Sequence, residues 1–224
     1  MSVWAVLAAA GRGERLGSDR PKAFARLGGR PLLAESLERL EASDWIDRIV
    51  IAAPPDWEEP SILVAEELAA TKVSSAVRGG ESRSESVRLA LAEVPEDAAV
   101  VLVHDAARPL LPEQVIERVL APLSEGWDGV VPALRLSDTV KRVEGERVVE
   151  TLRRDDLVAV QTPQAFLADA LRRAVAGDVA DATDCASLVE AGSGRVTWVE
   201  GDPRLLKVTD AADLELVESW LDEE

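Results

Sequence analysis

Short apolar runs alternate with longer amphipathic segments along this chain, and this alternation restricts the folds that it can adopt. We expect strands at the short apolar runs rich in β-branched residues, namely residues 3–10, 48–53, 72–77, 98–103, 129–132 and 195–199. Apolar residues at helical spacing predict helices over residues 32–40, 62–70, 84–94, 113–123 and 167–176. Several strands are apolar on both faces, as in a sheet covered by helices on each side. The sequence therefore predicts an α/β fold with a mostly parallel twisted sheet and helices on both faces.

One segment departs from this alternation and is typical of a long polar β-hairpin. Residues 134–143 and 147–154 mix polar and apolar side chains on either side of the turn Glu144-Gly145-Glu146. A hairpin this polar is not expected to be buried in its own domain, so it either extends into solvent or embraces a second subunit. We expect one domain over residues 1–224, with a β-arm at about 135–154 for contact in a homodimer.

The last helix is expected to begin just after Thr209. Threonine is a favourable N-cap residue, because its hydroxyl can accept a hydrogen bond from the first helical turn. Asp210 and Asp213 follow, where a negative charge is stabilised by the helix dipole. Thr209 is therefore predicted to cap this helix.

Composition excludes several classes of protein. The 25 Lys and Arg residues stand against 42 Asp and Glu residues, a net charge of −17 that argues against binding to nucleic acid or to an anionic membrane. A single cysteine, Cys185, rules out a disulfide framework and is expected to be a buried thiol, and the single histidine, His104, leaves no multi-histidine metal site. No apolar run reaches the length of a membrane span. We expect a soluble, cytoplasmic protein without dedicated protein ligands for a metal.

The most informative motif follows the first predicted strand. Gly11 and Gly13 form a glycine-rich turn that lets backbone N–H groups approach a phosphate closely. No GK[ST] follows, so this is no P-loop, and Leu16 occupies the third glycine position of a dinucleotide fingerprint. The turn carries four cations against Glu14 and Asp19, and these cations are Arg12, Arg15, Arg20 and Lys22. Such a positive loop in an acidic protein suits a triphosphate whose charge grows during transfer.

The loop Ala8-Ala-Ala-Gly-Arg-Gly-Glu-Arg15, followed by Pro21-Lys22, resembles the signature of nucleotidyltransferases that join a nucleoside triphosphate to a sugar or polyol phosphate. Further segments are similar to the 2-C-methyl-D-erythritol 4-phosphate cytidylyltransferase family, and they are residues 79–87, 101–109, 137–141, 161–164, 183–184 and 206–209. The resemblance runs in family order from Val3 to beyond Thr209. It implies a Rossmann-like nucleotidyltransferase fold and cytidylyl transfer from CTP to methylerythritol phosphate in non-mevalonate isoprenoid synthesis.

The resemblance also implies roles for matching residues on the nucleotide side. The backbone of four loop residues would cradle the CTP phosphates, namely Ala9, Ala10, Gly11 and Gly13. Arg15 and Lys22 would stabilise the transition state at the α-phosphorus. Cytosine and its ribose would be recognised by Gly80, Glu81 and Ser86. Asp105 and Ala106, at the end of a central strand, would contact the sugar or the acceptor hydroxyls.

On the acceptor side, the resemblance places Thr139 and Arg154 on the arm, where they would reach the neighbouring subunit's site and hold methylerythritol phosphate. Thr183 and Lys207 would complete that pocket, with Arg108 and Thr162 as secondary candidates. Two positions depart from the family pattern: Glu81 stands where aspartate is frequent, and Cys185 stands where an acidic residue is expected.

The implied cofactor is Mg²⁺, held largely by the triphosphate oxygens because it gives up its water reluctantly. One alternative keeps the scaffold and changes the acceptor to another polyol phosphate, such as ribitol 5-phosphate. Another is a nucleotide-binding regulator without turnover, which would have no need of Arg15, Lys22 and Lys207.

Overall fold

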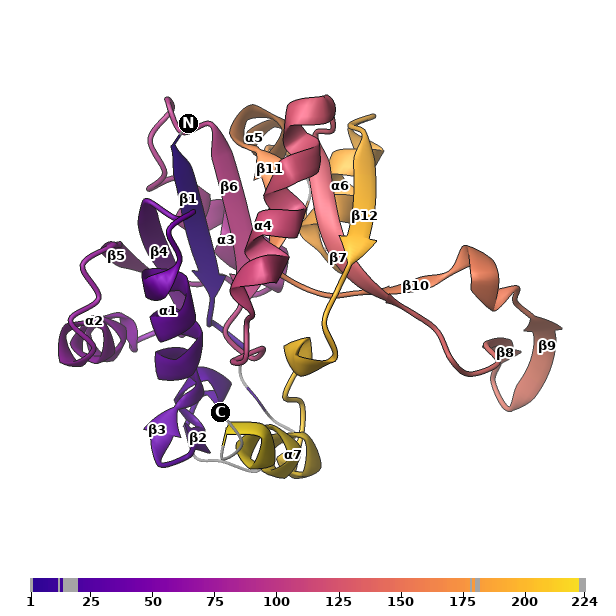
Figure 1. Ribbon diagram of the computed structural model, residues 1–224, viewed down its shortest axis with the longest axis horizontal. Coiled ribbons are helices and arrows are strands. Elements are labelled where there is room, and N and C mark those ends of the chain that lie inside the picture. The colour runs from indigo at the N-terminus through magenta and orange to yellow at the C-terminus, as the bar shows by residue number, and fades with distance from the viewer. Residues whose placement is uncertain (1, 12, 14–19, 178, 180–181, 222–224) are drawn as a thin grey trace.

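A computed structural model describes residues 2–221 except 12, 14–19, 178, 180 and 181. Its centre is an eight-stranded sheet in the order β10-β7-β11-β6-β1-β4-β5, with β12 also paired to β7 (Figure 1). Its strands are β1 (Val3–Ala8), β4 (Arg48–Ala53), β5 (Val73–Arg78), β6 (Val100–Asp105), β7 (Gly129–Arg135), β10 (Val158–Val160), β11 (Gln164–Leu167) and β12 (Val196–Glu200). The six predicted strands are all present, with ends shifted by a few residues.

Parallel pairing joins β6, β1, β4 and β5, and also β12 to β7. In contrast, β11 runs antiparallel between β6 and β7, and β10 runs antiparallel to β7. The sequence analysis did not identify β10 and β11. Both are short, and the polar segment with Pro163 that separates them hides the strand pattern.

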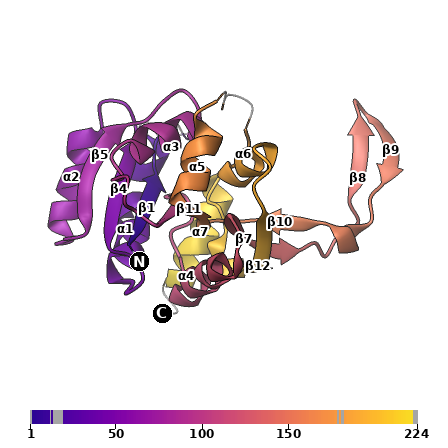
Figure 2. The same cartoon turned by 90° about the horizontal axis from the view of Figure 1, so that it is seen from above.

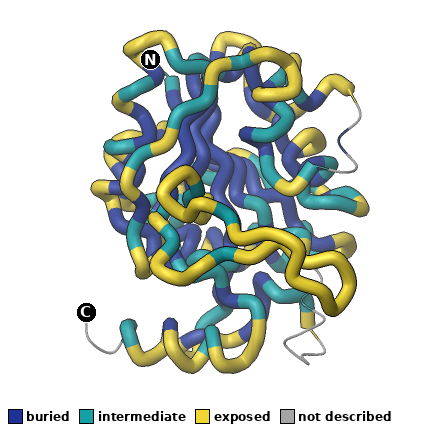
Figure 3. The backbone as a smooth tube through the Cα atoms, turned by 90° about the vertical axis from the view of Figure 1, so that its right-hand side faces the viewer, coloured by how far each residue is buried: buried dark blue, intermediate teal, exposed yellow. Residues whose placement is uncertain are grey.

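Helices cover both faces of the sheet, as predicted. On one face α1 (Leu32–Ala42), α2 (Glu58–Glu67) and α4 (Glu113–Leu120) pack against inward side chains such as Leu7 and Ile51. The opposite face carries α3 (Arg83–Leu91), α5 (Ala168–Val175) and α6 (Cys185–Ala191), packed against neighbours such as Val6 and Val50. Because successive strand residues point to opposite faces, strands that are apolar throughout supply two cores at once. Figure 3 shows these buried strands inside an exposed outer surface.

A third, smaller core lies beyond the carboxyl ends of the central strands. It joins the C-terminal helix α7 (Ala211–Leu221) to the short hairpin of β2 (Arg26–Leu27) and β3 (Arg30–Pro31) through apolar side chains that include Leu27, Val208 and Val217. Two 3₁₀ turns, η2 (Lys22–Phe24) and η5 (Pro203–Leu205), lead into this region. Figure 1 shows α7 beside β2 and β3.

The cap of α7 lies one residue later than predicted. The Asp210 carboxylate accepts a hydrogen bond from the Asp213 N–H at 3.0 Å, which makes Asp210 the N-cap residue. Asp213 reaches back and accepts hydrogen bonds from the backbone N–H groups of Thr209 and Asp210 and from the Thr209 hydroxyl. The prediction for Thr209 was wrong because aspartate is an equally good cap and directly follows it.

The predicted hairpin is present and projects from the body as an arm (Figure 2). Its strands β8 (Lys141–Glu144) and β9 (Arg147–Thr151) pair only with each other, and every residue in them is exposed. They are shorter than the sequence pattern suggested, and the turn η4 (Arg154–Asp156) leads back to β10. Within the described part of the chain, no helix is long and apolar enough to cross a membrane.

Candidate active site

A cavity of about 570 Å³ opens at the carboxyl ends of the parallel strands. The segments after β1, β4, β5 and β6 all contribute to its wall, which is where open α/β sheets bind ligands. The predicted site residues that line it are Ala9, Ala10, Gly11, Gly13, Lys22, Gly80, Glu81, Ser86, Asp105, Ala106 and Lys207. Residues separated by almost 200 positions in the sequence therefore meet at one cavity.

The glycine loop brings Lys22 back to the end of β1. The Ala9 N–H donates to the carbonyl of Ala52 at 2.9 Å, and the Lys22 N–H donates to the carbonyl of Gly11 at 3.3 Å. Gly13 has a φ of +70°, and a Cβ there would lie 2.6 Å from the Cβ of Lys22. Glycine is required at this position by both its backbone conformation and the close approach of the lysine. Arg15 lies outside the described residues.

The segment between β5 and α3 forms the second wall, and its own hydrogen bonds fix its shape. Ser82 caps α3 by accepting from the Glu85 N–H at 3.1 Å. The Ser86 hydroxyl accepts from the Gly80 N–H at 3.0 Å and donates to the carbonyl of Ser82 at 2.8 Å. The Glu85 carboxylate accepts from the Glu81 N–H at 2.9 Å. Ser86 thus orders the backbone at the cavity wall.

A charged cluster lies on the cavity floor around Asp105. One carboxylate oxygen accepts from Nε of Arg83 at 2.7 Å, and the other accepts from Nζ of Lys207 at 2.8 Å. Burial favours the neutral form of Asp105, but the two cations outweigh it and hold the pKa of this carboxyl well below its usual range. Asp105 is therefore ionised near neutral pH.

His104 stabilises the carboxyl end of β6, the strand that carries Asp105, through hydrogen bonds. Its Nε2 donates to the carbonyl of Arg108 at 3.0 Å, and its Nδ1 accepts from the Thr162 hydroxyl at 3.1 Å. The Thr162 oxygen in turn accepts from the Asp105 N–H at 3.1 Å. Burial lowers the pKa of His104 to about 4, so the ring is neutral near pH 7. Arg108 donates to the carbonyl of Leu205, so the two secondary candidates, Arg108 and Thr162, hold the cavity's frame and do not line it.

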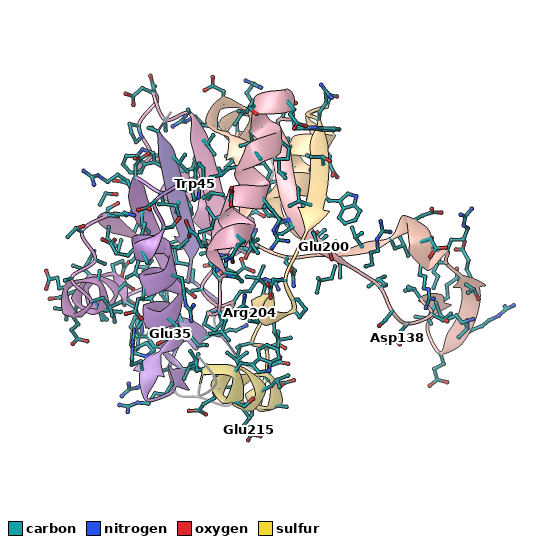
Figure 4. All side chains as sticks on the ribbon, in the orientation of Figure 1. Glu35, Trp45, Asp138, Glu200, Arg204 and Glu215 are labelled. Carbon is teal, nitrogen blue, oxygen red and sulfur yellow. The ribbon has the colours of Figure 1, made fainter. Side chains whose placement is uncertain are left out.

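Three predicted acceptor residues lie away from the cavity wall of this single chain. Thr139 and Arg154 are exposed on the arm, where Arg154 donates to the carbonyl of Ser137. Figure 4 shows Asp138, the neighbour of Thr139, on the arm well away from the body. Thr183 is exposed just before α6 and does not line the cavity.

The structure also adds residues that the sequence analysis did not assign to the site. Ser82, Arg83, Ala107 and Thr209 line the cavity. Arg83 lies within residues 79–87, one of the segments that resemble the family. That resemblance was the one feature of the sequence that pointed to Arg83. Its partner Asp105 is 22 residues away and on another element, so the spacing of residues along the chain does not reveal the pair.

Comparison with known proteins gives a consistent result. Residues 3–223 match the family model described as "IspD: 2-C-methyl-D-erythritol 4-phosphate cytidylyltransferase". Proteins of that name from Frankia casuarinae and Nocardia farcinica are each 46% identical to this chain, over 98% and 99% of it and over 81% and 94% of their own lengths. The crystal structure of the Francisella tularensis protein of that name is similar with a TM-score of 0.83 at 30% identity, covering 98% of this chain and 99% of that one.

Proposed function

The chain belongs to the 2-C-methyl-D-erythritol 4-phosphate cytidylyltransferase family, and on this basis we propose which cavity residues bind each substrate and which stabilise the transition state of cytidylyl transfer. The enzyme transfers the cytidylyl group of CTP to 2-C-methyl-D-erythritol 4-phosphate, in the non-mevalonate route to isoprenoids. The products are 4-CDP-2-C-methyl-D-erythritol and pyrophosphate. A phosphate oxygen of the acceptor forms a bond to the α-phosphorus of CTP as the bond to pyrophosphate breaks.

The observation that carries the proposal is that Lys22 and Lys207 line one cavity with the glycine loop. Transfer of this kind requires positioning and charge neutralisation more than a nucleophilic side chain. In our proposal the backbone of residues 9–13 binds the triphosphate. Lys22 and Arg15 stabilise the charge that develops around the α-phosphorus.

The nucleoside is assigned to the opposite wall. Gly80 and Glu81 offer backbone groups to cytosine, and Ser86 holds those groups in place. Asp105 and Ala106 meet the ribose or the acceptor hydroxyls. Support comes from the hydrogen bonds that order this wall.

The acceptor is assigned to Lys207 and Thr183 of one subunit together with Thr139 and Arg154 of a second. A homodimer in which each arm completes the other site would explain why these two arm residues are exposed here. Three valines on the arm are also exposed, and a partner would cover them: Val143, Val148 and Val149. A cytoplasmic location is part of the proposal, supported by the single cysteine and the acidic composition.

Mg²⁺ is the proposed cofactor. Glu81 and Asp105 are the carboxylates among the cavity's described lining residues, and the described residues contain no cluster of three or more His, Cys, Asp and Glu side chains suited to a metal. This donor set fits an ion held chiefly by the triphosphate, with Asp105 as the protein's carboxylate on the floor. When bound, the ion would neutralise phosphate charge.

The test is pyrophosphate release from CTP and Mg²⁺ with methylerythritol phosphate or ribitol 5-phosphate, for the wild type and for Lys22→Ala. We expect release with methylerythritol phosphate alone. In Lys22→Ala we expect kcat to fall by on the order of 100-fold, because a charge aimed at the transition state is lost, while CTP affinity changes far less. Loss of CTP binding with unchanged turnover per bound site would contradict the role of Lys22, and release with ribitol 5-phosphate alone would contradict the acceptor.

A further inference from the structure

Arg83 is held in a way that protein stability alone does not explain. Its Nε donates to Asp105 at 2.7 Å, its Nη1 lies 3.6 Å from the sulfur of Cys185, and its Nη2 is buried without a hydrogen-bond partner in the described part of the chain. A thiol is a weak acceptor, and a buried charged donor without a partner costs free energy. Asp105 is thus the one strong partner that this guanidinium has among the described residues.

Asp105 lies between the two cations and gives one carboxylate oxygen to each. Only 8% of the Asp105 side chain is exposed, against 20% for Arg83 and 41% for Lys207, so the carboxylate is the most buried of the three groups. Because Arg83 occupies one oxygen, Lys207 is restricted to the other, and all three residues line the cavity.

Resting on the proposed role of Lys207, we propose that Arg83 is a positioning residue. Through the Asp105 carboxylate it holds the Lys207 ammonium group where that group meets the phosphate of methylerythritol phosphate. Without Arg83, Lys207 would have a buried carboxylate to itself and would be drawn toward it, away from the acceptor. The three side chains carry a net charge of +1, and this positive charge can pair with the acceptor phosphate.

The experiment compares Arg83→Met, Arg83→Gln and Arg83→Lys with the wild type in kcat/KM for each substrate at pH 7.5. For Arg83→Met we expect kcat/KM for methylerythritol phosphate to fall on the order of 100-fold, with little change in KM for CTP. Arg83→Lys should recover part of this loss, because it restores a cation beside Asp105.

Two matched controls separate positioning from damage to the fold. Arg88→Met removes an exposed arginine from the same helix, and Cys185→Ala removes only the weak contact of Arg83, so both should behave like the wild type. If Arg83→Met does not fold, Arg83→Gln, which can still donate to Asp105, should show the same selective loss for the acceptor. Equal losses for CTP and acceptor, or no recovery in Arg83→Lys, would overturn the proposal. A wild type without pyrophosphate release would instead refute the proposed function.

Discussion

The lowered pKa of His104 makes the free energy of unfolding depend on pH. In the folded protein burial lowers its pKa to about 4, whereas an unfolded histidine titrates near 6.5. The unfolded chain therefore binds the proton more readily. The free energy of unfolding therefore decreases as the pH falls from about 6.5 toward 4, because protonation of His104 favours the unfolded chain.

We expect His104→Gln to reduce this acid sensitivity. The free energy of unfolding of the wild type should drop between pH 7 and pH 4.5 by about 2 kcal/mol more than that of the variant. Urea denaturation at several pH values measures both curves. The carboxylates contribute equally to each protein, so parallel curves would show that His104 does not carry this effect.

Individual site residues were predictable where local chemistry fixes them. Gly11 and Gly13 were selected from the glycine-rich turn next to cations; both line the cavity, and at Gly13 the geometry shows that no side chain fits. Arg83 was not, because its role depends on a contact made across the fold. The cap of α7 was misplaced because Thr209 and Asp210 are both good caps and only the hydrogen bonds distinguish them.

At the scale of elements, the parallel core was predictable because its strands are apolar on both faces. Strands β10 and β11 were not, because both are short and the polar segment with Pro163 that separates them hides the strand pattern. The third core was likewise invisible in the sequence. It brings α7 against β2, and a hydrogen bond from the Gly28 N–H to Glu218 at 3.0 Å links the two.

This third core lies close in the sequence to both cavity lysines. Lys22 begins η2, which leads into the β2–β3 hairpin, and Lys207 directly precedes the buried Val208. We expect Val217→Ala, which leaves a void at a fully buried position, to cost about 2 kcal/mol of stability. It should also lower kcat at temperatures where the sheet stays folded. Thermal unfolding and pyrophosphate release measure the two effects.

Leu216→Ala provides the control for this prediction. Leu216 is the preceding residue of the same helix and is 45% exposed, so its truncation should leave stability and activity unchanged. If Val217→Ala destabilised the protein but its folded fraction kept full kcat, α7 would support the fold without positioning the lysines.

At the scale of the whole molecule, the exposed arm makes a cross-subunit site testable by complementation. A Lys22→Ala chain keeps its arm, and an Arg154→Ala chain keeps its catalytic cavity. In a mixed dimer, one site would combine the intact cavity with the intact arm. We therefore expect mixed dimers, co-expressed and isolated through two different affinity tags, to be far more active than either variant alone. Mixed dimers as inactive as their parents would assign each arm to its own subunit.

The position of Lys207 late in the sequence affects the order in which the sheet and the cavity are completed during synthesis on the ribosome. Every strand of the large sheet precedes Pro203, whereas Lys207 and α7 follow it. Because domains begin to fold from the N-terminal side during synthesis, the nascent chain can assemble its sheet before the cavity has its second lysine. A chain released after β12 would contain every strand of the sheet but not Lys207, to which we assign the acceptor phosphate. Under that assignment, full activity requires translation beyond residue 207.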